Sequence, residues 1–259
     1  MAILEGKTAL VTGSSRGIGR AIAMRMAEQG ARVVLCARTA DTLSQVARDI
    51  QQASGKAASI AADLREPEAC RRVVDFAVET FNGLDIVVNN AGATRRGPFV
   101  DLTDEDWADS FALKFFGAVR VTRAAWPHLK RSSGSVVFIS GAGGRTPGAE
   151  FAAGGAVNAA MLSLTKALAE TGIRDGVQVN CVNPGMVRTD RLKVRLSSTM
   201  KEEGIDLAAA ERRLVESSGV TRIGEPEDIA ALVAFLVGSE GRFLQGSLID
   251  IDGGATKTV

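Results

Sequence analysis

TGSSRGIG, residues 12–19, joins the apolar run at 8–11 to an amphipathic segment that begins near Ile18. Its glycines, Gly13, Gly17 and Gly19, let the backbone turn sharply from strand to helix and approach a ligand without a Cβ in the way. Free N–H groups and the positive end of the helix macrodipole would then stabilise a pyrophosphate. A glycine triplet alone fits any tight strand-to-helix turn, but its place after an apolar strand predicts a dinucleotide cradle.

Apolar runs of strand length alternate with helix-period segments along the whole chain. This alternation is typical of a parallel sheet covered by helices. It predicts an α/β fold in a single domain, residues 1–259: a Rossmann fold whose doubly wound parallel seven-stranded sheet has helices on both faces. The strands are expected near 7–12, 31–37, 57–61, 84–89, 134–140, 176–182 and 246–250.

The composition argues against several classes of partner. With 31 basic and 30 acidic residues the net charge is +1, which disfavours a nucleic-acid-binding surface or a membrane surface held by charge. The N-terminus reaches Glu5 before a signal-peptide apolar region could form, and the longest apolar run, 229–237, is too short to span a bilayer. Cys36, Cys70 and Cys181 lie far apart, so no metal site and no disulfide framework is expected. A small-molecule ligand and a cytoplasmic location fit best.

Four motifs at the predicted strand ends occur together. They are the Gly-x-x-x-Gly-x-Gly spacing after Thr12, NNAG at 89–92, NPGMVRT at 183–189 and DGG at 252–254. The chain thereby resembles the short-chain dehydrogenase/reductase family over most of its length. The resemblance implies a nicotinamide cofactor, a variable substrate lid at about 190–224, and a homo-oligomer, either a dimer or a tetramer.

The resemblance also assigns cofactor contacts to this chain. An adenine contact is implied for Asp63, for which a helix cap is the alternative, and nicotinamide contacts are implied for Val187 and Thr189. The full set of implied cofactor-binding residues is Gly13, Ser15, Arg16, Gly17, Ile18, Gly19, Arg38, Asp63, Leu64, Asn90, Ala91, Gly92, Pro184, Gly185, Val187 and Thr189.

The end of the second strand indicates which nicotinamide cofactor is preferred. NAD-binding family members usually carry an acidic residue at the position of Ala37, where a carboxylate would repel a 2′-phosphate. Here Arg38 follows, and with Arg16 it could pair with that phosphate. NADP(H) is therefore the expected cofactor, although two ordinary surface arginines remain the alternative.

The family's catalytic residues are a Tyr-x-x-x-Lys pair on one helix, a preceding Ser, and an Asn on the previous helix. This chain has no tyrosine at all, and no lysine between Lys130 and Lys166. Alignment to the family places Gly141 at the Ser position, Gly154 at the Tyr position and Asn158 at the Lys position. It places Lys114 at the Asn position, so Lys and Asn have exchanged helices.

Lys114 is the first candidate for a replacement acid or base. It shares a helical face with Trp107, Phe111, Ala118 and Val121, which predicts a buried amine with a lowered pKa. A lysine that extends from a mostly buried helix to solvent is the alternative.

The other candidates are weaker. Asn158 and Ser140 are possible catalytic residues, but Ser140 and Thr146 also fit polar positions at a strand end and in a loop. Arg145 could anchor an anionic substrate or be solvated, and His128 is expected to be structural. Gly154 and the next glycine each cost a helix about 1 kcal/mol relative to Ala, so they should either make space for a substrate or admit a second helix.

Three functions fit this sequence. The first is an NADP(H)-dependent oxidoreductase with a non-standard active site, in which Lys114, Asn158 or water replaces tyrosine and hydride passes to an imine, an activated alkene or a carbonyl. The second is an NADP-binding enzyme of lyase, isomerase or cyclase type, without redox chemistry. The third is a catalytically inactive pseudoenzyme that partners an active subunit.

Overall fold

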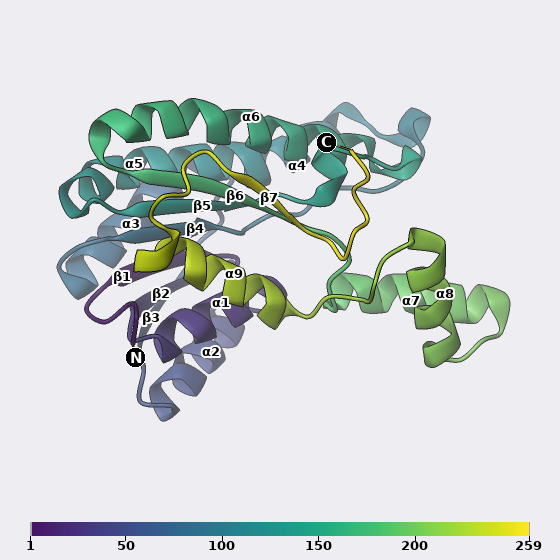
Figure 1. Cartoon of the computed structure of the whole chain (residues 1–259), viewed down its shortest axis with the longest axis horizontal. Coiled ribbons are helices and arrows are strands. Elements are labelled where there is room, and N and C mark those ends of the chain that lie inside the picture. Colours follow the sequence, from purple (N-terminus) through teal and green to yellow (C-terminus); the bar gives the residue numbers. More distant parts are fainter. Residues whose placement is uncertain (1, 259) are drawn as a thin grey trace.

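The computed structural model describes residues 2–258 and has one sheet of seven parallel strands. The strands pair in the order β3-β2-β1-β4-β5-β6-β7 (Figure 1). Their bounds are β1 Thr8–Thr12, β2 Arg32–Ala37, β3 Lys56–Ala61, β4 Ile86–Asn89, β5 Ser135–Ile139, β6 Gln178–Pro184 and β7 Leu248–Ile251. The predicted doubly wound Rossmann fold is confirmed, with each strand within two residues of its expected bounds.

Helices cover both faces of this sheet (Figure 1). They are α1 Gly17–Glu28, α2 Ala40–Gln52, α3 Pro67–Phe81, α4 Asp104–Phe111, α5 Gly117–Ser132, α6 Ala152–Asp175, α7 Asp190–Glu203, α8 Leu207–Ser218 and α9 Pro226–Val237. Within residues 2–258, no helix combines the length and the apolar character needed to cross a membrane.

The core has two halves because strand side chains alternate between the faces. On β1, Ala9 and Val11 pack with Met26 of α1 in one apolar cluster, which also contains residues of α2 and α9. Leu10, between them, packs with Val121 of α5 in a second cluster with α3 and α6. Burial of both faces explains why the strands are continuous apolar runs.

The order of the strands reverses between β1 and β4, which are neighbours although β2 and β3 lie between them in sequence. In open α/β sheets, ligands bind outside the carboxyl ends of the strands at such a reversal. The TGSSRGIG turn and the NNAG motif follow these two strands, so the fold places both motifs at this point.

A π-helical turn, Ala112–Phe116, separates α4 from α5 and contains Lys114. Thr103 and Asp106 form a capping box at the start of α4. The helix α5 continues past Pro127 to Ser132. The fully buried Leu129 lies in this last part, so burial of its side chain offsets the backbone hydrogen bond that Pro127 cannot make.

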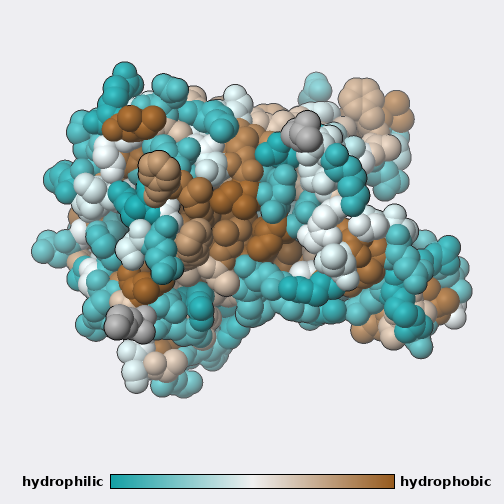
Figure 2. All heavy atoms as spheres, in the orientation of Figure 1, coloured by the Kyte–Doolittle hydropathy of each residue, from teal (hydrophilic) through white to brown (hydrophobic). Residues whose placement is uncertain are grey.

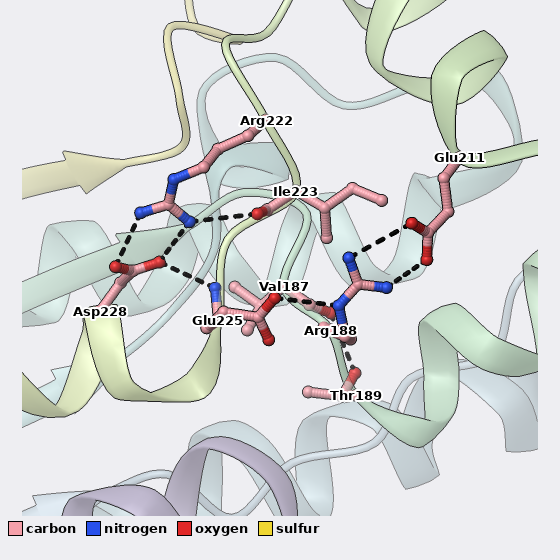
Figure 3. A network of polar contacts seen from close by, with 8 residues as sticks. All are labelled: Val187, Arg188, Thr189, Glu211, Arg222, Ile223, Glu225 and Asp228. Carbon is pink, nitrogen blue, oxygen red and sulfur yellow. Dashed lines mark hydrogen bonds and ion pairs between the residues drawn. The ribbon is translucent and has the colours of Figure 1, made fainter. Parts of the chain in front are cut away.

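The helices α7 and α8 extend from the sheet layers as a separate pair (Figure 1). They enclose a small apolar cluster of their own, which includes Leu192, Leu196 and Leu214. Arg188, just before α7, connects this pair to the rest of the protein. Its guanidinium donates to the carboxylate of Glu211 on α8, and its Nε lies 2.9 Å from Oε1 of Glu225 at the start of α9 (Figure 3). The pair is thus held at its base by ion pairs and packs internally.

Candidate active site

The predicted cradle at the end of β1 combines left-handed glycines, close backbone packing and an uncapped helix start. Gly13 and Gly17 adopt positive φ angles of +66° and +53°. A Cβ on Gly13 would lie 2.9 Å from Cα of Ala91, and one on Gly19 would overlap the carbonyl oxygen of Gly13. No side chain caps the first turn of α1, and that turn contains no acidic residue. The open N–H groups therefore fit an anionic group.

Polar contacts tie the cradle to the end of β4. The side-chain amide of Asn90 donates to the carbonyl oxygens of Thr12 (3.0 Å) and Gly13 (3.1 Å). The Thr12 hydroxyl accepts from the backbone N–H groups of Asn90 and Ala91, both at 3.0 Å. Thr12 is a positioning residue that the sequence analysis did not identify, although it precedes the glycine motif. These contacts fix the ends of β1 and β4 relative to each other, at the point where the strand order reverses.

We predict that Gly19→Ala damages the cradle, because its methyl group would overlap the Gly13 carbonyl oxygen and the Asn90 amide. Overpacking of this kind costs about 1–3 kcal/mol, which thermal or urea unfolding would measure. NADPH affinity should fall as well, since relief of the overlap displaces the loop. Gly83→Ala, just before the amino end of β4, is the control for NADPH affinity: its φ of +150° makes this substitution destabilising as well, but its methyl group meets no atom within 4 Å and lies away from the cradle. An unchanged NADPH affinity in Gly19→Ala would contradict the assigned cradle.

Two arginines border the cradle. Arg16 is strongly exposed and lies 3.5 Å from the Asp190 carboxylate. Arg38 is exposed immediately after β2, and its charge helps to lower the pKa of Asp109, after the main effect of a hydrogen bond from Arg65. A cavity of about 240 Å³ beside the cradle is lined in part by Arg16, Gly17 and Thr189. This rim is positively charged and open to solvent.

The remaining cofactor candidates lie along the same edge. The Asp63 carboxylate accepts a hydrogen bond of 3.0 Å from the backbone N–H of Arg65. The residue at the N-cap of α3 is Glu66, so the helix-cap alternative for Asp63 was wrong. Leu64 is buried behind this turn.

The NPGMVRT motif brings β6 next to the cradle. Pro184 ends β6 and Gly185 follows it, packed so closely that a Cβ would lie 2.6 Å from the Asp252 side chain. Val187 is buried and forms a backbone bridge to Gly224. Thr189 begins α7, and its side chain would lie 3.3 Å from a Cβ on Gly17. The fold therefore joins two motifs that are about 170 residues apart.

Lys114 and Asn158 meet at the centre of this edge. The Lys114 Nζ donates to Oδ1 of Asn158 at 2.6 Å and to the carbonyl oxygen of Ser140 at 2.8 Å. Burial, with a smaller effect from the charge of Arg191, lowers the pKa of Lys114 to about 8. Lys114 is half-buried rather than fully buried, its expected lowered pKa is confirmed, and the alternative of an amine that extends to solvent was wrong. An ammonium has three N–H donors, and the third finds no protein acceptor among residues 2–258.

Asn158 and Ser140 support this lysine. Asn158 is buried, and its backbone carbonyl accepts a 3.0 Å hydrogen bond from the Ser140 hydroxyl. A Cβ on Gly141 would lie 2.9 Å from the Asn158 amide nitrogen. The Ser140 hydroxyl is therefore occupied in joining β5 to α6, whereas its carbonyl oxygen orients Lys114.

The ring of Phe151 covers Gly154. A Cβ on Gly154 would overlap this ring, and a Cβ on Gly143 would lie 2.8 Å from it. Pro147 packs on Gly155 in the same way, 2.6 Å from its Cβ position. The sequence analysis expected these helix glycines to make space for a substrate or a second helix. Within residues 2–258 the chain's own preceding loop, and neither a substrate nor a second helix, fills the space at their Cβ positions.

Two other candidates do not belong to the site. Arg145 lies 3.1 Å from the Asp250 carboxylate and also donates to the Leu248 carbonyl oxygen, so it holds β7. Both alternatives for it, an anchor for a substrate and a solvated side chain, were wrong. His128 contacts Arg131 at the far end of α5, as expected of a structural residue.

The structure adds two arginines that the sequence analysis missed. Arg191, in the first turn of α7, donates to the Gly92 carbonyl oxygen. The guanidinium of Arg96 lies 4.3 Å from the centre of the Phe151 ring. Both lie in segments without a recognisable motif, so only the folded chain brings them to the site.

Known proteins are similar to this chain over nearly its whole length. The short chain dehydrogenase family profile matches residues 7–199. An uncharacterised oxidoreductase of Mycobacterium tuberculosis is 37% identical over 255 residues, covering 98% of this chain and 93% of its own. The 3-oxoacyl-acyl-carrier-protein reductase FabG of Vibrio cholerae is 33% identical, covering 97% of this chain and 98% of its own.

Solved structures are equally similar. L-Sorbose reductase from Gluconobacter frateurii, crystallised with NADPH and L-sorbose, has a TM-score of 0.96 and 31% identity, with 100% of both chains covered. A short chain dehydrogenase from Burkholderia cenocepacia in complex with NADP has a TM-score of 0.85 and 38% identity, covering 97% of this chain and 98% of its own. The family match, the identities and the shared fold agree: this chain belongs to the short-chain dehydrogenase/reductase family of oxidoreductases.

Proposed function

We propose that this protein is an NADP(H)-dependent oxidoreductase with a non-standard active site, which transfers hydride to an imine, an activated alkene or a carbonyl. One observation carries the proposal: the half-buried Lys114 packs beside Gly92, just after β4, and its amine is held by Asn158. Solved relatives that contain NADPH or NADP support the choice of cofactor.

The cradle binds the pyrophosphate through the backbone of Ser15, Gly17 and Ile18 at the start of α1. Arg16 and Arg38 pair with the 2′-phosphate, a charge-assisted contact that NAD cannot make. The adenine and ribose of the cofactor would lie against residues at the ends of two other strands: Asp63, Leu64, Asn90 and Ala91. The Pro184 to Thr189 segment holds the nicotinamide.

When bound, the nicotinamide supplies a hydride to the electrophilic carbon of the substrate. Lys114 then provides the proton that completes the reduction, through the N–H that has no protein acceptor. The Ser140 carbonyl oxygen and Oδ1 of Asn158 accept hydrogen bonds from two N–H groups of Lys114. These two contacts orient the third N–H toward the substrate. In the reverse reaction the neutral amine takes the proton back. A pKa of about 8 leaves both forms of Lys114 accessible near neutral pH.

An imine is the substrate that asks least of this site. Lys114 can donate its proton to the basic nitrogen of an imine, and the positive charge that results makes the carbon electrophilic before hydride arrives, so an acid with a pKa of about 8 suffices. A ketone requires its proton as the alkoxide forms, for which the family uses tyrosine. We therefore place imines and activated alkenes before ordinary ketones.

A second candidate function is NADP binding without redox chemistry, either in a lyase, isomerase or cyclase or in an inactive partner subunit. The observation that favours it is the Phe151 ring on Gly154, because this ring takes the space next to the position that the family gives to tyrosine.

Titration of the protein with NADPH and NADH tests the cofactor assignment that both candidates share. NADPH should bind more tightly than NADH, because Arg16 and Arg38 contact only the 2′-phosphate. Equal affinities for NADPH and NADH would show that the protein has no 2′-phosphate site. Absence of binding of either cofactor would exclude both candidate functions.

The α7–α8 pair, residues 190–224 with its connections, is proposed as the substrate lid of a single-domain protein. Arg191 and Thr189 at its beginning border the cradle, while the rest of the pair extends from the sheet layers (Figure 1). This position allows the pair to cover the site without a change in the sheet.

We also propose that the protein forms a homo-oligomer. The edge strand β7 is half-buried along its whole length, and Figure 2 shows apolar atoms gathered in the middle of the face on which Figure 1 draws this strand. Unpaired edges and apolar patches of this kind favour association. Sedimentation analysis should give a dimer or tetramer, and a monomeric mass at all concentrations would contradict the proposal.

A further inference from the structure

We propose that the substrate carries an anionic group, a carboxylate or a phosphate, bound by Arg96, Arg191 and Arg195 opposite Lys114. This inference rests on the proposed function, because it places the anion in the same site. The three arginines come from two segments, the loop after β4 and the first two turns of α7. Their common feature is a shortage of neighbouring carboxylates.

Arg191 is the inner member of this set. Its guanidinium donates to the Gly92 carbonyl oxygen, and the Lys114 stem packs on the same glycine, with Cδ 2.9 Å from its Cβ position. The two cations therefore flank one residue at the end of β4. Burial, Arg16 and Arg96 all lower the pKa of Arg191, as expected when positive charges crowd together.

Arg96 and Arg195 form the outer part. The Arg96 guanidinium lies over the Phe151 ring, and that ring covers Gly154 in the site. Burial and the charge of Arg195 lower the pKa of Arg96, and Glu150 is the one carboxylate that opposes this effect. Arg191 and Arg195 are four residues apart on α7, so they lie on one face, where like charges destabilise the helix.

None of the three arginines has a carboxylate within 4.0 Å in the part of the chain between residues 2 and 258. By contrast, Arg188, close to Arg191 in the sequence, binds two carboxylates. Lys114 and three arginines that, among the described residues, have no carboxylate in contact with their guanidinium groups make a site that an anion would stabilise. The guanidinium fork matches the two oxygens of a carboxylate or phosphate. The substrate class is therefore an imine, activated alkene or carbonyl compound that also bears such an anion.

The test is calorimetric titration of NADPH-saturated protein with succinate, with inorganic phosphate and with neutral succinamide. Saturating NADPH occupies the cradle, so an anion cannot bind there. Wild type should bind succinate or phosphate but not succinamide, and the anion that binds more tightly names the chemical group. Arg96→Gln and Arg195→Gln should each weaken that binding by about 10- to 100-fold, the value of a charge-assisted contact.

Arg95→Gln is the matched control, because Arg95 is the exposed neighbour of Arg96 and no hydrogen bond or ion pair within residues 2–258 involves its side chain. It should bind the anion as the wild type does. Arg195→Gln removes no aromatic contact, so it keeps the test valid if Arg96→Gln disturbs Phe151. Equal affinities in all four proteins, or no anion binding by wild type, would overturn the inference. If NADPH itself fails to bind, the proposed function fails, and the same comparison without NADPH still decides whether these arginines bind an anion.

Discussion

Lys114→Met is expected to reduce turnover by about 10²- to 10⁴-fold while NADPH affinity changes little. The range is the usual contribution of a positioned general acid or base. Methionine keeps the length and apolar character of the stem that packs on Gly92, but it removes the donor to Ser140 and Asn158. Steady-state kinetics and NADPH titration measure the two effects separately. Lys56→Met, an exposed lysine on β3, is the control and should retain full activity.

The pH dependence of turnover identifies the same amine. Reduction requires the protonated form, so kcat should be constant below pH 8 and fall as the pH rises through the pKa of about 8. Oxidation requires the neutral form, and its kcat should rise through the same pH. Lys114→Met should remove both transitions. Unchanged turnover in this variant would exclude Lys114 from the mechanism, and water or Asn158 would be the remaining proton source.

Arg38→Asp should reverse the cofactor preference. It removes the guanidinium that we propose to pair with the 2′-phosphate and introduces a carboxylate that would repel it, as at the neighbouring position in NAD-binding family members. Two effects of about 1.5–3 kcal/mol each correspond to a loss of roughly 10²- to 10⁴-fold in NADPH affinity. NADH affinity should be retained or improve, because a carboxylate can accept hydrogen bonds from the ribose hydroxyls.

The control for this substitution is Arg48→Asp, which makes the same charge change at an exposed position in the second half of α2. Long-range electrostatic effects of the charge change are similar in the two variants, so a difference between them isolates the contact of Arg38. An unaltered ratio of NADPH to NADH affinity in Arg38→Asp would show that the 2′-phosphate lies elsewhere.

The sheet could be predicted from the sequence because its strands are buried on both faces. Leu10 and its neighbours face opposite clusters, and such strands form unbroken apolar runs that are visible without a structure. The cradle could be predicted from the sequence as well, because it requires glycines: Gly13 and Gly17 have positive φ angles, and Gly19 is closely packed. The apolar runs and the glycine spacing can be read from local sequence, although the close packing of Gly13 and Gly19 on residues 90 and 91 comes from the fold.

The candidate catalytic centre could be predicted only in part from the sequence. The exchange of Lys114 and Asn158 between two helices follows from alignment, but their contact joins residues 44 positions apart on separate elements. Arg145 forms a salt bridge with Asp250 on β7. Because the two residues are far apart in the sequence, this pairing could not be predicted from the residues near Arg145. The arginines of the proposed anion site come together in the same way, from a loop and from α7.

Phe151 is an instructive intermediate case. It lies three residues before Gly154, close enough for an aromatic ring to cover a glycine at the start of a helix. The sequence analysis considered only a substrate or a second helix as occupants of that space. A bulky residue one turn before an unexplained helix glycine is therefore a signal that sequence analysis can use.

The measurement that tests the central claim most directly is hydride transfer from NADPH deuterated at its reactive carbon. The purified protein is mixed with this cofactor and with imines, activated alkenes and carbonyl compounds, each in an anionic and a neutral form, and the products are analysed by mass spectrometry. We predict a reduced product that carries one deuterium, formed fastest from an anionic imine or alkene. Tight NADPH binding without deuterium in any product would contradict the claim of an oxidoreductase and favour the non-redox function.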